Sequence, residues 1–185
     1  MRKTRGWLLS SLPALYWIIA TPSAAEVLHQ SESGFAVRDE VTISAPADQV
    51  WTALTDRIGS WWHPDHTYTG DAGNLSIDPS PGGCFCEALP GGGVQHLEVV
   101  YADEARLLRL SGGLGPLQEI GASGTLALTL TASETGESTR ASYSYAVHGH
   151  LEGGLGAWAA AVDGVLSQQL ERLGRFVETG DAETP

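Results

Sequence analysis

One long amphipathic helical pattern at the C-terminus restricts what the rest of the chain can fold into. From about Leu155 to Val177, apolar residues recur at intervals of three and four over more than five turns, the longest such stripe in the sequence. The apolar face of this helix has to be buried, and the only candidate partner is a sheet built from the preceding segments. The pattern therefore predicts a sheet curled around a single helix, an arrangement that encloses a cavity.

Seven strand patterns separated by turn signals precede this helix. The first spans Phe35 to Ile43, and the other six lie at about 74–78, 83–89, 94–102, 106–111, 124–132 and 139–148. Between the first two strands, Pro46 suits the start of a short helix that apolar spacing continues to Leu54, and a second short helix is expected over 58–62. The loop that follows, residues 63–73, is rich in turn residues and is predicted to cover the cavity mouth.

The N-terminus has the pattern of a secretory signal peptide. Basic residues within positions 2–5 precede an apolar run over 7–20, and the small residues Ser23 and Ala25 follow. The apolar run is short for a transmembrane helix, which needs about 20 residues. We therefore expect cleavage before Glu26 and export of the protein to the periplasm or beyond the cell, and an uncleaved anchor is the alternative.

Removal of residues 1–25 leaves about 160 residues, the length of a single domain that buries roughly two-thirds of its unfolded surface. Within it we expect a polar lead-in over 26–34, the folded domain over 35–178 and a disordered tail over 179–185. The exported part carries seven basic against 22 acidic residues, a net charge of −15 with neutral histidines. Because this charge repels phosphate backbones and anionic lipid, neither nucleic acid nor a membrane is an expected partner of the cleaved chain.

Cys84 and Cys86 are the only cysteines and are separated by one residue. On an extended strand their side chains point to the same face, about 6.5–7 Å apart along the chain, which exceeds the usual separation of disulfide-bonded residues. We therefore expect two thiols that do not bridge each other. A metal site is an alternative, because two thiolates with His96 from the next strand suit zinc or copper(I), although a CxC pair alone is a weak signal.

Three segments together resemble a known superfamily. They are Ile43-Ser-Ala-Pro-Ala-Asp-Gln-Val-Trp-Thr-Ala-Leu54, Pro81-Gly-Gly-Cys-Phe-Cys-Glu87 and Val99-Val-Tyr-Ala-Asp-Glu-Ala-Arg-Leu-Leu-Arg-Leu110. In this order they resemble the START-like superfamily, also called the Bet v 1-like or SRPBCC group, and within it the branch homologous to activators of the Hsp90 ATPase. The resemblance implies an α+β helix-grip fold, in which a curved seven-stranded antiparallel sheet wraps around a long C-terminal helix over an apolar cavity. Such folds host lipid carriers, hormone receptors, cyclases and co-chaperones, so the resemblance does not imply one activity.

The chain contains many aromatic residues for a single small domain, and ligand cavities are typically lined by apolar and aromatic side chains with few polar groups. Trp62 adjoins the predicted mouth loop, and Trp158 lies in the first turn of the long helix. We expect a cavity wall formed by Trp62, Phe85, Tyr101, Tyr143, Tyr145, Trp158, Val162 and Leu166, with His96 or His148 orienting a polar group of the ligand.

No catalytic motif stands out in the sequence. Candidate proton donors and acceptors are scattered, namely His63, Asp65, His66, Asp71, Glu87, Glu98, His148 and His150. The leading hypothesis is an exported protein, monomeric or weakly dimeric, that binds a small apolar or amphipathic molecule and needs no cofactor. The alternatives are a cyclase- or hydrolase-like enzyme that uses a His/acid pair at the same cavity, and a metal-binding protein. A buried carboxylate hydrogen-bonded to a cavity histidine would favour an enzyme, and an unbroken apolar lining would favour a protein that only binds and carries its ligand.

Overall fold

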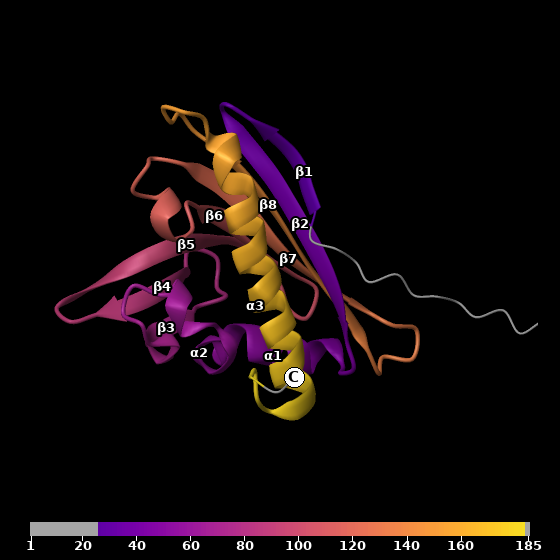
Figure 1. Cartoon of the computed structure of the whole chain (residues 1–185). Coiled ribbons are helices and arrows are strands. Elements are labelled where there is room, and N and C mark those ends of the chain that lie inside the picture. The colour runs from indigo at the N-terminus through magenta and orange to yellow at the C-terminus, as the bar shows by residue number, and fades with distance from the viewer. Residues whose placement is uncertain (1–25, 184–185) are drawn as a thin grey trace, which may run out of the picture.

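The computed structural model describes residues 26–183 and shows one open antiparallel sheet of eight strands, curved around a long C-terminal helix (Figure 1). The order of strands across the sheet is β1-β2-β8-β7-β6-β5-β4-β3. The strands are β1 (Glu26–Ser31), β2 (Gly34–Ile43), β3 (Leu75–Ile77), β4 (Cys84–Leu89), β5 (Gly92–Asp103), β6 (Leu107–Gly112), β7 (Ser123–Ala132) and β8 (Thr139–His148). The α-helices are α1 (Ala47–Asp56), α2 (Ile58–Trp61) and α3 (Ala159–Thr179). Short 3-10 helices are η1 (Pro64–His66), η2 (Ala72–Asn74), η3 (Gly115–Leu117) and η4 (Leu155–Trp158).

The core lies between α3 and the concave face of the sheet, with α1 and α2 at one end (Figure 1). Leu166, Leu170 and Leu173 on the inner face of α3 are at most 5% exposed, because residues three and four apart share one face of a helix. In β8, every second side chain from Thr139 to Val147 is buried, as expected of a strand with one face on the core. The helical period of three to four residues in α3 and the period of two in β8 therefore identify the surfaces that pack together.

The structure confirms the predicted α+β helix-grip architecture, with each of the seven predicted strands and all three predicted α-helices present. The predicted signal peptide, residues 1–25, lies outside the described residues. Among the residues that are described, no helix is both long enough and apolar enough to cross a membrane.

The strand count is eight because residues 26–31, expected to be a polar lead-in, form the edge strand β1. This strand pairs antiparallel with β2, and Arg38 Nη2 lies 2.7 Å from Glu26 Oε2 across the pair. The side chains of β1 are mostly exposed, so the segment carries no apolar alternation. Backbone pairing with β2 determines the conformation here, and a sequence pattern based on burial cannot reveal it.

The predicted disordered tail is also folded over most of its length. Gly180 adopts the left-handed conformation, with φ of 82°, and its amide donates to Phe176 O at 2.8 Å, which ends α3 and turns the chain back. Ala182 is 3% exposed, and Glu183 Oε1 lies 2.6 Å from Arg172 Nη1. Residues 180–183 therefore pack against α3.

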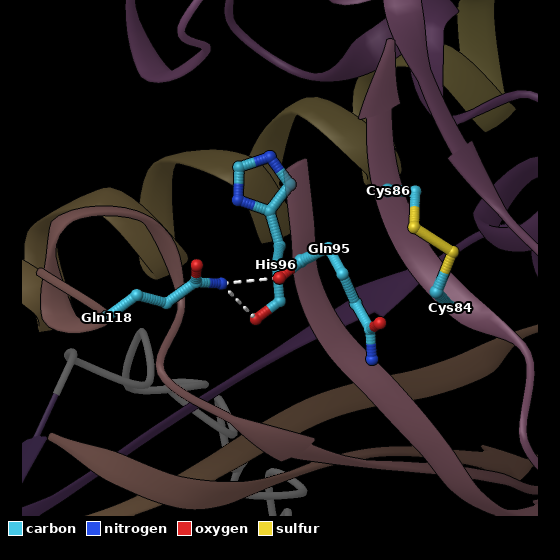
Figure 2. Close-up of a disulfide and its surroundings, with 5 residues drawn as sticks. All are labelled: Cys84, Cys86, Gln95, His96 and Gln118. Carbon is cyan, nitrogen blue, oxygen red and sulfur yellow. Dashed lines mark hydrogen bonds between the residues drawn. A yellow bond between two sulfur atoms is a disulfide. The ribbon is translucent and has the colours of Figure 1, made fainter. Parts of the chain in front are cut away.

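The prediction that Cys84 and Cys86 do not bridge each other is wrong, since the two residues form a disulfide (Figure 2). Their Cα atoms are 5.4 Å apart, closer than an extended strand would place them. The pairing of β4 with β5 shifts register at this point, with Phe85 opposite Leu97 but Cys86 opposite Gln95. The short Cα separation shows that β4 is not fully extended beside this irregular pairing, and the argument from an ideal strand therefore fails.

Candidate functional site

A cavity of about 380 Å³ lies between the sheet, α3 and two loops. One loop is the mouth loop predicted from the sequence, residues 63–73, and the other, residues 113–122, connects β6 to β7 and contains η3. Most of the lining side chains are apolar, and the lining consists of Trp62, Asp65, His66, Thr67, Tyr68, Phe85, His96, Leu114, Gly115, Pro116, Leu117, Trp158, Ala161, Val162, Val165 and Leu166.

The structure brings six of the ten predicted site residues together around this cavity: Trp62, Phe85, His96, Trp158, Val162 and Leu166. Tyr101 is 44% exposed on β5, where the guanidinium of Arg109 lies over its ring, and His148 is exposed at the end of β8. Neither residue is part of the wall. Ala161 and Val165 also line the cavity and were missed, although Val165 belongs to the apolar stripe of the long helix.

Tyr143 and Tyr145 are buried in the core rather than in the cavity wall, and each uses its hydroxyl to hold another element. Tyr145 Oη donates to Gly112 O at 2.9 Å and accepts from Leu114 N at 3.0 Å, so it holds the start of the β6–β7 loop at the cavity. Burial raises the pKa of Tyr145 to about 12. Tyr143 Oη donates to Asp163 Oδ1 at 2.6 Å and thereby connects β8 to α3.

A buried carboxylate, Glu87 on β4, is hydrogen-bonded to the cavity histidine His96 on β5. The distance from His96 Nε2 to Glu87 Oε2 is 3.2 Å, and the two residues are 4% and 1% exposed. The same carboxylate accepts hydrogen bonds from Tyr68 N at 3.0 Å and Thr69 N at 2.7 Å. Glu87 therefore holds both the imidazole and the mouth loop, and it is the kind of His/acid pair that the enzyme alternative requires.

The pKa values of both members favour an ionised Glu87 and a neutral His96. Burial by itself would raise the pKa of Glu87, but hydrogen bonds from Tyr68, Thr69 and His96 outweigh it and place the pKa below its ordinary value. Burial lowers the pKa of His96, although the hydrogen bond and the charge of Glu87 act in the opposite direction. An ionised carboxylate can only accept, so Nε2 of His96 carries the proton and Nδ1 presents a lone pair.

The β-bulge between β4 and β5 explains the position of His96. His96 is the extra residue between the paired positions Gln95 and Leu97, so both His96 and Leu97 are buried although they are adjacent in sequence. Figure 2 shows the imidazole pointing away from the disulfide and the side chain of Gln118 reaching the bulge. Gln118 Nε2 donates to Gln95 O at 2.5 Å and to His96 O at 3.0 Å. These hydrogen bonds hold the bulge and the β6–β7 loop together beside the cavity.

Glutamines of α3 hold the opposite end of the mouth loop. Gln169 Oε1 accepts from His63 N at 2.7 Å, and Gln168 Oε1 lies 2.9 Å from His66 Nε2. Trp62 Nε1 donates to His66 O at 3.0 Å, which closes the start of the loop on itself. The loop is thus fixed to α3 at one end and to Glu87 at the other.

The metal-binding alternative through Cys84, Cys86 and His96 is not supported, because both sulfurs are bonded to each other. Between residues 26 and 183, no group of three or more His, Cys, Asp or Glu side chains is arranged to hold a metal ion.

Solved structures share this fold at low sequence identity. A conserved protein of unknown function from Enterococcus faecalis, EF2215, superposes with a TM-score of 0.59 at 18% identity, over 86% of this chain and 78% of that one. CalU16 from Micromonospora echinospora superposes with a TM-score of 0.56 at 19% identity, over 89% of this chain and 88% of that one. The Aha1 dimer from Colwellia psychrerythraea superposes with a TM-score of 0.53 at 18% identity, over 78% of this chain and 97% of that one. These likenesses establish the START-like, Bet v 1-like fold.

No curated protein matches the chain. A family model does match, over residues 35–178, and its family is described as polyketide cyclase/dehydrase and lipid transport. The matched region contains the helix α3 almost entirely, both cavity loops and the Glu87–His96 pair. The chain therefore belongs to the polyketide cyclase/dehydrase and lipid transport family.

Proposed function

We propose that the protein binds a small apolar or amphipathic molecule in the cavity between the sheet and α3, as a monomer or weak dimer. The observation that carries this proposal is the cavity itself. Its volume of about 380 Å³ lies in the range of small-molecule sites, and its wall combines aromatic and aliphatic side chains with few polar groups. Membership in a family that includes cyclases and lipid transport proteins supports the same function.

Titration with an environment-sensitive apolar fluorophore tests this function. We expect saturable binding of one fluorophore per folded chain, because a single cavity of about 380 Å³ with a mostly apolar wall lies between α3 and the sheet. Native mass spectrometry of the protein from an exporting host should show a retained small molecule and the number of chains per particle. A fluorescence response that never saturates, together with no retained molecule, would contradict the proposal.

We also propose that the protein works outside the cytoplasm. Two features support export: the signal-peptide pattern before Glu26 and the disulfide between Cys84 and Cys86, since disulfides persist in oxidising compartments. N-terminal sequencing of the exported protein should give a chain that starts at Glu26. Recovery of a chain that still starts at Met1, in the membrane fraction, would instead indicate an uncleaved anchor.

The second candidate function is catalysis by proton transfer, and the Glu87–His96 pair is the specific observation that favours it. A neutral imidazole beside a cavity can remove a proton from a weakly acidic ligand, and the adjacent carboxylate would stabilise the resulting imidazolium. Exchange of the acidic hydrogens of 2-tetralone in deuterated water tests this function. Exchange that is faster with the wild type than with His96→Leu would support it, and equal rates would refute it.

A further inference from the structure

His96 Nδ1 is unusual within the described part of the chain, because it is the one buried side-chain nitrogen or oxygen there without a hydrogen-bond partner. The other ring nitrogen donates to Glu87, and the ring borders the cavity. Buried polar atoms are rarely left unpaired, since each then loses its hydrogen bonds to water without compensation. An unpaired acceptor at the edge of a mostly apolar cavity indicates where a ligand makes its polar contact.

The surroundings of Nδ1 restrict the chemistry of that contact. Because Glu87 fixes the proton on Nε2, Nδ1 can accept a hydrogen bond and cannot donate one. A ligand whose only polar group is a ketone, ester or ether therefore gains nothing at this atom. Carboxylates are disfavoured as well, because the ionised Glu87 and the cavity residue Asp65 place negative charge near this atom in a chain that is acidic overall.

We propose that the cavity selects apolar molecules that carry a neutral hydroxyl group, and that this hydroxyl donates a hydrogen bond to His96 Nδ1. This inference rests on the proposed binding function and identifies the class of ligand that the same cavity takes. Glu87 is a positioning residue, because it sets the tautomer and the orientation of the imidazole without touching the ligand. Alcohols and phenols both belong to this class of ligand, since both present the same donor.

Access to Nδ1 involves the mouth loop. The ring of Tyr68 stacks on His96, with 5.9 Å between ring centroids and 21° between ring planes, and the ring of Phe85 lies 5.0 Å away on the sheet. Phe85 is 3% exposed, whereas Tyr68 is 45% exposed and belongs to a loop. A rotation of the exposed Tyr68 side chain is therefore the movement that admits the hydroxyl, while the buried ring of Phe85 stays packed against the imidazole.

Three naphthalene derivatives of similar shape test the proposal on the full-length exported protein. 2-Naphthol carries a hydroxyl donor, 2-methoxynaphthalene replaces that donor with an ether, and 2-naphthoate carries an anion. We expect 2-naphthol to bind roughly tenfold more tightly than the ether, the difference made by one buried hydrogen bond, and 2-naphthoate to bind most weakly. His96→Leu should abolish the preference for 2-naphthol, whereas the control His148→Leu, at an exposed histidine, should preserve it.

Ring-nitrogen NMR of histidine gives a second measurement that does not depend on a variant. We expect His96 to carry its proton on Nε2, and we expect 2-naphthol, but not the ether, to shift the Nδ1 signal. Equal affinities for 2-naphthol and the ether, or a proton found on Nδ1, would overturn this inference and leave the binding function intact. If none of the three compounds binds, the proposed function itself fails, and this inference fails with it.

Discussion

Replacing Glu87 by leucine is expected to lower the free energy of unfolding by about 3–5 kcal/mol. The carboxylate accepts three hydrogen bonds, from Tyr68 N, Thr69 N and His96 Nε2, and it is 1% exposed. Leucine fills a similar volume but removes the buried acceptor of all three donors, and His96 Nε2 is left without its partner inside the domain. Chemical denaturation followed by tryptophan fluorescence would measure the loss, because Trp62 lies beside the same loop.

The matched control is Glu98→Leu, which removes an exposed carboxylate from the neighbouring strand β5 and should change the free energy of unfolding by less than about 0.5 kcal/mol.

The pH dependence of the loss of stability in Glu87→Leu gives a further check. Since the pKa of Glu87 in the folded chain lies below its ordinary value of 4.5, its stabilisation is complete above pH 4.5 and is lost as the pH falls through the folded pKa. The difference between wild type and Glu87→Leu should therefore shrink below pH 4.5, and a difference that stays constant there would contradict the assignment.

Filling the cavity is expected to weaken binding of the apolar fluorophore by roughly 50- to 100-fold. The double substitution Val162→Trp and Val165→Trp places two indole rings into the cavity from α3, where both valines are partly buried lining residues. Excluding a ligand from about 100 Å² of apolar contact costs about 2.5 kcal/mol, which corresponds to that loss of affinity. Equilibrium titration of the folded variant, with its helix content checked by circular dichroism, measures the effect.

Ala160→Trp is the control for this variant, because residue 160 lies on the same helix but is exposed and does not line the cavity. It adds an indole ring to α3 and should leave the affinity for the fluorophore unchanged. If the double variant bound as tightly as this control, the fluorophore would occupy another surface, and the cavity would no longer explain binding.

The features predicted from the sequence are those that depend on periodicity and local turn chemistry. The stripe from Leu155 to Val177 predicted α3, and alternation with turn residues predicted seven of the strands. The mouth loop and both tryptophans of the wall, Trp62 and Trp158, were predicted from their places beside these elements. Tyr143 and Tyr145 were misassigned because an aromatic residue on an inward strand face can line a cavity or fill the core, and only the path of α3 decides between the two.

The order of residues was enough to predict seven strands and three helices, because burial of apolar residues at a period of two or of about 3.6 leaves a record in the sequence. The polar contacts of the site, in contrast, follow from the tertiary structure. A bulge in β5 makes His96 the extra buried residue, the disulfide of β4 lies beside it, and Gln118 donates to the carbonyls of Gln95 and His96. The carboxylate of Glu87 gained its partners from a loop about 19 residues earlier in the chain and from the next strand. Such contacts are made by polar atoms that are distant in sequence, and they have no period, so no pattern in the chain records them in advance.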